Sequence, residues 1–271
     1  MGMISIAIPD SCLEDETTKD NKSKKISVIA RAAAIFGVRD ILVYDDGGSS
    51  SDRRLLLAVL RYLDTPPYLR KRLYPRDTTL RYVGVLHPLN TPGHMVPSDP
   101  HRIKRGDVRE GVVISSRSGR LLDVGTKTPL PYYGRDEVGS RVTIRYLQGY
   151  PDMAYTVIPR DDAPIYLGYN TKKRGRLASM LSSWDGKIIL TSRRGKIPNI
   201  QTLAEYAAST RLLLVFGSTS RGIHDILGTR IKSVQNSRVL NLFPEQHTGT
   251  VRLEEAILGS LAILNIGRSL Q

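Results

Sequence analysis

Hydrophobic and polar positions follow one rhythm at both ends of the chain. Short apolar runs, four to eight residues long and often ended by Gly or Pro, alternate with segments in which apolar residues recur with helical spacing. The runs that predict strands are residues 4–8, 40–48, 164–170, 187–195, 211–217 and 238–244. The helical segments are residues 19–36, 52–63, 174–184, 200–210 and 253–264. Alternating strands and helices predict an α/β fold with a Rossmann-like parallel sheet.

The rhythm changes between residues 89 and 163. This segment is rich in Gly and Pro and contains short alternating runs, "REGVVISS", "RLLDVG" and "SRVTIRYL", separated by turn sequences. The pattern predicts a small all-β barrel, of the OB type by size and spacing, with an SH3-like barrel as the alternative. We therefore expect a discontinuous α/β domain, residues 1–88 and 164–271, interrupted by an inserted OB-like β-barrel domain at 89–163.

The net charge of the chain predicts the kind of partner that it binds. The formal net charge is +14 and the pI is about 10, which predicts a polyanionic partner; a generally basic, salt-bridged surface is the alternative. Lys and Arg outnumber Asp and Glu by 14 to 11 in residues 1–88, by 11 to 9 in 89–163 and by 15 to 6 in 164–271. Most of the excess therefore belongs to the C-terminal third.

Several classes of protein are excluded or disfavoured. No apolar run reaches the roughly 20 residues of a membrane span, and "MGMISIAIPD" lacks the basic start of a signal peptide. The single cysteine, Cys12, allows no internal disulfide and no cysteine metal cluster, so we expect a reducing cytoplasm. The five histidines are scattered, and no metal site is predicted. The sequence contains no GxSxG motif, so it does not indicate a hydrolase of that type.

Three successive strand ends carry polar residues and glycines: "LTSRRG", "VFGSTSRG" and "NLFPEQHTGT". Ligands of open α/β sheets bind beyond the carboxyl ends of strands, so we expect the three ends to converge on one pocket. "GSTSRG" lacks the lysine and the spacing of a P-loop, and a tight strand-to-helix turn that needs glycine is the simpler interpretation of these residues alone. His247 is either a general base or an exposed loop histidine.

The segment after the third strand end predicts an amphipathic helix. Thr250 is expected to cap it, and Glu254 and Glu255 favour its positive N-terminal end. Its apolar face is wide, which predicts packing against a second subunit as well as the sheet. Arg252 is expected either to pair with a neighbouring glutamate or to have a functional role.

The same C-terminal residues resemble a known family. They match the signature of the SPOUT class of S-adenosylmethionine-dependent RNA methyltransferases, in its RNA uridine N3 methyltransferase branch, which has N-x-x-P-x-Q followed by T-[VI]-R-x-E-E-A-I. The matching residues here are Asn241, Pro244, Gln246, Thr250, Val251, Arg252, Glu254, Glu255, Ala256 and Ile257. "TSRRG", "LLLVFG", "REGVV", "DVG" and "RVTI" extend the resemblance over essentially the whole chain.

The resemblance implies a sheet whose C-terminal part forms a trefoil knot, a homodimer with each active site at the subunit interface, and S-adenosyl-L-methionine held in the knot without a metal. It places four residues near the donor, Arg194, Gly217, Asn241 and Leu242. Their expected neighbours are Thr191, Ser218, Pro244 and Gln246.

The implied reaction is methyl transfer to RNA, for example to uridine N3 of ribosomal RNA. That nitrogen must lose a proton, and Arg194 or Arg252 could stabilise the deprotonated base. Five tyrosines of the insert could stack on unpaired bases or belong to the barrel core: Tyr132, Tyr133, Tyr146, Tyr150 and Tyr155. Two alternatives remain: a non-catalytic RNA-binding protein of ribosome assembly with a vestigial donor site, and a methyltransferase of protein or small molecules.

Overall fold

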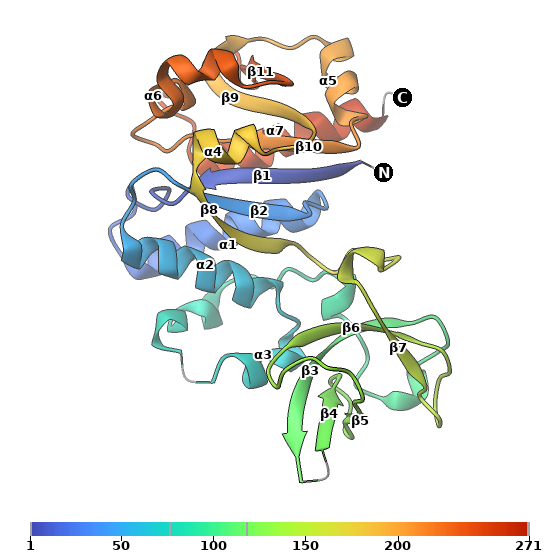
Figure 1. Ribbon diagram of the computed structural model, residues 1–271. Helices are drawn as coiled ribbons and strands as arrows, with labels where there is room; N and C mark the ends of the chain where they lie inside the picture. Colours follow the sequence, from blue (N-terminus) through green and yellow to red (C-terminus); the bar gives the residue numbers. More distant parts are fainter. Residues whose placement is uncertain (1, 76, 118, 270–271) are drawn as a thin grey trace. The chain divides into compact units, whose positions relative to one another are not determined.

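A computed structural model describes residues 2–75, 77–117 and 119–269 (Figure 1). The chain divides into two compact units. Unit 1 comprises Met1–Arg61, Thr79–His87 and Tyr169–Gln271, and unit 2 comprises Tyr62–Thr78 and Pro88–Gly168. Unit 2 differs from the expected insert 89–163 mainly by including residues 62–78. In this segment, the Tyr68 hydroxyl donates a hydrogen bond of 2.9 Å to the carbonyl oxygen of Glu110.

Unit 1 contains a six-stranded sheet in the order β11-β9-β10-β1-β2-β8, in which every pair is parallel. The strands are β1 (Met3–Pro9), β2 (Asp40–Asp45), β8 (Asn170–Arg176), β9 (Lys187–Lys196), β10 (Arg211–Val215) and β11 (Ser237–Leu240). The central strands β1 and β10 are almost continuously apolar and buried, as strands covered on both faces require. The predicted α/β parallel sheet is confirmed.

Helices cover both faces of this sheet. They are α1 (Lys19–Ile35), α2 (Ser50–Asp64), α4 (Leu177–Ser182), α5 (Ile200–Ala207), α6 (Ile223–Leu227) and α7 (Leu253–Ser269). The short helices α4 and α6 pack on the sheet face that carries Ala7, Leu42 and Leu213. Helix α7 packs against α1 and α5, and Figure 1 shows α1 and α7 behind the sheet and α4 in front of it.

One predicted strand was placed wrongly. Residues 164–169 form no strand, and β8 begins at Asn170 and runs through the polar sequence that we expected to start a helix. The segment is extended because β2 supplies backbone partners, with Asp40 paired to Asn170 and Val43 to Lys173. Hydropathy missed β8 because an edge strand with exposed side chains needs no apolar residues.

Unit 2 contains a five-stranded antiparallel sheet in the order β5-β4-β3-β6-β7, preceded by helix α3 (Pro67–Leu73). Its strands are β3 (Val108–Ser116), β4 (Gly119–Asp123), β5 (Leu130–Pro131), β6 (Arg141–Tyr146) and β7 (Tyr155–Ile158). The sheet curls, because the Tyr155 hydroxyl on β7 donates a hydrogen bond to the carbonyl oxygen of Pro131 on β5, at the opposite edge.

The tyrosines of unit 2 fall into two groups. Tyr132 and Tyr146 are 5% and 1% exposed and belong to the apolar core. Tyr133 and Tyr150 are 92% and 49% exposed. Tyr155 is partly buried and packs against the core. The Tyr150 ring contacts the His101 ring, with the centroids 3.9 Å apart, so Tyr133 is the better placed of the exposed pair for a stacking contact.

No helix among the described residues is long and apolar enough to cross a membrane.

Candidate active site

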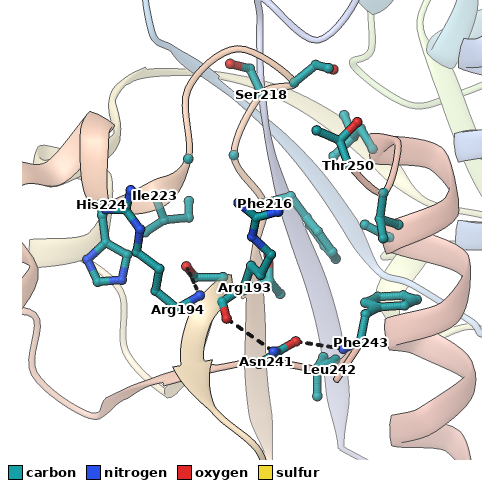
Figure 2. Close-up of a pocket in the computed structure, with 18 of the residues that line it drawn as sticks. Arg193, Arg194, Phe216, Ser218, Ile223, His224, Asn241, Leu242, Phe243 and Thr250 are labelled. Atoms are coloured by element: carbon teal, nitrogen blue, oxygen red, sulfur yellow. Dashed lines mark hydrogen bonds between the residues drawn. The ribbon is translucent and has the colours of Figure 1, made fainter. Parts of the chain in front are cut away.

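The three polar strand ends meet in one pocket of unit 1, with a volume of about 340 Å³ (Figure 2). Its walls are the end of β9, the loop between β10 and α6, the loop after β11, and the first turns of α6 and α7. Figure 2 shows His224 and Arg194 on one side of the pocket and Thr250 and Phe243 on the other. Seven of the predicted donor-site residues line it: Thr191, Arg194, Gly217, Ser218, Asn241, Leu242 and Gln246.

The first wall is the carboxyl end of β9. The Thr191 hydroxyl donates a hydrogen bond of 2.9 Å to the carbonyl oxygen of Val215, which ties β9 to the end of β10. Arg193 donates to the carbonyl oxygen of Gly249 at 3.1 Å. The Arg194 guanidinium is exposed and forms no ion pair within the described part of the chain. This wall therefore presents a free positive charge to the pocket.

The second wall is the loop 216–222. The Tyr44 hydroxyl donates to the carbonyl oxygen of Phe216 at 2.7 Å, and the Ser218 amide donates to that of Arg221 at 2.9 Å. A Cβ atom on Gly217 would lie 2.8 Å from the Arg221 oxygen, so the turn closes only with glycine. The loop is thus the tight strand-to-helix turn that the sequence indicated, and it also lines the pocket.

The third wall follows β11. The Asn241 side-chain amide donates to the carbonyl oxygen of Arg193 at 3.2 Å, and the Asn241 side-chain oxygen accepts from the Phe243 amide at 3.0 Å. Gln246 donates to the carbonyl oxygen of Thr248 at 3.0 Å. Pro244 and His247 are exposed and do not line the pocket. β11 already ends at Leu240, and Pro244 lies in a turn after it, with its ring outside the cavity.

The start of α7 agrees with the predicted segment 253–264, but its cap does not. Its first residue is Leu253, and the Arg252 amide donates to the Glu255 carboxylate at 2.9 Å, so the expectation that Thr250 caps the helix is wrong. Thr250 lines the pocket instead. The Arg252 guanidinium lies 3.6 Å from a carboxylate oxygen of Glu16, and the Arg252 side chain is not part of the pocket lining.

Two lining residues were missed by the sequence analysis. The Nε2 atom of His224 and the hydroxyl oxygen of Ser260 are buried and have no hydrogen-bond partner within the described residues. Buried polar atoms are normally hydrogen-bonded, so two unpartnered atoms in one pocket fit a polar ligand. His224 lies two residues after Gly222 of the glycine loop, which was the available signal, whereas Ser260 lies in a helix whose pattern is mainly apolar.

A pair of buried carboxylates lies behind the second wall, where β1 and β2 end. Asp10 accepts the amides of Asp46 and Gly48 at 3.2 and 3.0 Å, and Asp46 accepts the Ser11 hydroxyl at 2.7 Å. Burial, together with the hydrogen bond to Asp10, raises the pKa of Asp46 to about 6, against the opposing effects of Ser11 and Arg221. Burial also acts to raise the pKa of Asp10, but its hydrogen bonds outweigh burial and lower it.

The raised pKa of Asp46 predicts a pH dependence of stability. Between pH 3.8 and about 6 the folded protein keeps a proton on Asp46 that the unfolded chain has lost, so the free energy of unfolding falls as the pH rises through this window. In the wild type, this decrease in the free energy of unfolding should be on the order of 1–2 kcal/mol, and Asp46→Asn should abolish it. Urea unfolding at a series of pH values across the window measures both. Asp45→Asn, at a more exposed neighbouring carboxylate, should retain the decrease. Parallel curves for wild type and Asp46→Asn would contradict this assignment.

The described residues contain no group of three or more His, Cys, Asp or Glu side chains that could hold a metal ion. The pocket instead combines a free guanidinium, backbone groups of three loops and unpartnered polar atoms at the carboxyl edge of a parallel sheet. This is the arrangement of a site for an organic polar ligand, as in α/β proteins that bind nucleotides and related cofactors.

Comparison with known proteins identifies the family. A family model described as "Putative RNA methyltransferase" matches residues 3–264, so the chain belongs to this family of RNA methyltransferases and is an enzyme. It is 30% identical to a human 28S rRNA (uridine-N(3))-methyltransferase, covering 97% of this chain and 78% of the relative. The mouse protein of the same name is 31% identical, with 97% and 76% covered. A Halobacterium salinarum protein without an assigned activity is 30% identical, with 97% and 98% covered.

Proposed function

We propose that the chain transfers a methyl group from S-adenosyl-L-methionine to N3 of a uridine in ribosomal RNA. The human and mouse relatives, both 28S rRNA (uridine-N(3))-methyltransferases, support the substrate. The observation that carries the proposal is the free Arg194 guanidinium in the pocket formed by the three strand ends. A cation beside the reacting base favours the deprotonated form of a uracil imide.

The pocket fits the proposed donor. Its volume of about 340 Å³ is within the range of ligand pockets, and its walls supply backbone groups, hydroxyls and the unpartnered atoms of His224 and Ser260. Bound S-adenosylmethionine supplies an electrophilic methyl group and needs no metal. Asn241 holds the third wall against the first through its bond to Arg193, which keeps the pocket in shape.

Arg194 and Arg252 differ as candidates for the catalytic cation. Arg194 lines the pocket, whereas Arg252 pairs with Glu16 outside it. We therefore assign stabilisation of the N3 anion to Arg194. The assignment to Arg252 requires a rearrangement that breaks its ion pair.

Three finer features belong to the same proposal. A trefoil knot is proposed from the sequence resemblance of the C-terminal residues alone. An OB-like barrel is supported by the curled antiparallel sheet of unit 2. A homodimer is supported by apolar side chains that α7 leaves exposed, Leu258 at 41% and Ile266 at 61%.

The dimer is expected to show in solution. Leu258 and Ile266 would be covered by the second subunit, so light scattering at micromolar concentration should give twice the chain mass. Leu258→Glu with Ile266→Glu should yield folded monomers, and circular dichroism would verify folding. A wild-type mass of one chain would contradict the dimer.

The proposed function is tested by mapping modified nucleosides. Ribosomal RNA from a strain lacking the gene should contain an unmethylated uridine that is 3-methyluridine in the parent strain, as determined by mass spectrometry. The purified protein with S-adenosylmethionine should restore it. Transfer of labelled methyl only to protein or small molecules would refute an RNA substrate, and absence of S-adenosylmethionine binding by calorimetry would favour the non-catalytic alternative.

A further inference from the structure

The edge strand β8 carries positive charges that the pocket does not use. Lys172 forms an ion pair of 2.6 Å with Asp40. Lys173, Arg174 and Arg176 are exposed and pair with no carboxylate of the described residues. We call these three residues the β8 cation row. Three uncompensated cations within four residues repel one another, so the row is best satisfied by an external anion.

The row lies at the carboxyl end of the parallel strands, as the pocket does. β8 is parallel to β2, and Arg176 is paired with Asp45 at the carboxyl end of β2 (Figure 1). The strand order places β1 and β2 between β10 and β8. Three strand spacings of about 4.8 Å put the end of β8 roughly 14 Å from the end of β10. An RNA strand with one nucleotide in the pocket can reach this distance within a few nucleotides.

A bulge in β8 shapes the row. Lys173 pairs with Val43 and Arg176 with Asp45, so β8 advances three residues while β2 advances two. The extra residue of β8 therefore falls within the row, at Arg174 or Gly175. A Cβ atom on Gly175 would meet nothing within 4 Å, which leaves open space beside the backbone at the centre of the row.

A simpler role for cations on an edge strand is to prevent edge-to-edge pairing of sheets. Edge protection does not require that the cations lie at the same end of the strands as the pocket. It also does not explain why residues 164–271 contain 15 basic but only 6 acidic residues. We propose that the β8 cation row binds the phosphodiester backbone of the RNA substrate next to the target nucleotide. This inference rests on the proposed function, and its recognition is electrostatic, without regard to base sequence.

The test compares two double variants that each remove two positive charges. Arg174→Gln with Arg176→Gln alters the row, and Arg230→Gln with Lys232→Gln alters exposed cations on the connection leading to the amino end of β11. Fluorescence anisotropy with a labelled oligouridylate is measured over a series of KCl concentrations. The slope of log Kd against log salt should fall by about 1.4 for the row variant, at about 0.7 per lost phosphate contact, and stay unchanged for the control.

Equal slopes for the row variant and the wild type would overturn the inference. Self-association of the row variant with unchanged RNA affinity would also overturn it and assign the cations to edge protection. Calorimetry with S-adenosylmethionine on the same proteins separates the two proposals. A wild type that binds RNA through the row but not S-adenosylmethionine would refute the proposed function and leave the RNA surface standing.

Discussion

Arg194→Gln is expected to lower the kcat of methyl transfer by about 10²–10³-fold, the usual effect of removing one fixed donor that stabilises developing negative charge. Arg194 has no ion-pair partner among the described residues, so its removal leaves no buried charge behind and should not unfold the protein. Single-turnover transfer of labelled methyl to ribosomal RNA measures the loss. Because the cation acts on the deprotonated base, raising the pH should partly restore the rate of the variant.

Lys196→Gln is the matched control. Lys196 is exposed on the same strand, two residues further along, but does not line the site. Its loss should change RNA affinity slightly and kcat little. Arg252→Gln measured in parallel completes the comparison: a full rate in Arg194→Gln together with a large loss in Arg252→Gln would transfer the catalytic role to Arg252 and refute our assignment.

The sequence predicted those parts of the fold that depend on apolar burial. β1, β2, β10 and the first half of β9 were found because strand segments that are covered on both faces must be apolar. β8 was missed because its stability comes from backbone pairing with β2 at an exposed edge, and this leaves no hydropathy signal. Because β8 lies at an exposed edge, its side chains are charged, and hydropathy could not identify the strand or the cationic surface that it forms.

The candidate site was predictable where glycine and polar residues follow a buried strand. The strand ends that carry Gly217 and Asn241 were found in this way, the family resemblance placed these two residues near the donor, and both line the pocket. Pro244 was included because it belongs to a sequence signature, but a residue that turns the chain need not face the cavity. Ser260 and His224 were missed because both lie on helices. The spacing of residues along the chain does not show which side of a helix faces the loops that form the pocket.

The network around the start of α7 was also beyond sequence reasoning. Arg252 was expected either to pair with Glu254 or Glu255 or to act in the site; its guanidinium instead pairs with Glu16, more than two hundred residues away in the chain. Glu254 lies 3.4 Å from Lys25, whose side chain is 1% exposed. Helix spacing identifies local partners, whereas Glu16 lies in the segment that joins β1 to α1 and Lys25 lies in α1 itself.

Gly195→Ala is expected to damage the donor site through the backbone. A Cβ atom at this position would lie 2.5 Å from the carbonyl carbon of Leu240 and 2.8 Å from the amide nitrogen of Asn241. Neither backbone atom can rotate away, so β9 and the segment after β11 must separate. The added methyl group should lower the free energy of unfolding by about 1–3 kcal/mol.

The consequence for binding should exceed the consequence for folding, because Asn241 and Leu242 line the pocket on the far side of this contact. We expect the Kd for S-adenosylmethionine to rise at least about tenfold, equivalent to about 1.4 kcal/mol, when measured by calorimetry at a temperature where the variant is folded. Gly84→Ala is the matched control, since a Cβ atom there meets nothing within 4 Å. If Gly195→Ala binds the donor as tightly as the control does, then the third strand end is not a wall of the donor site, and the donor must be held by the first two alone.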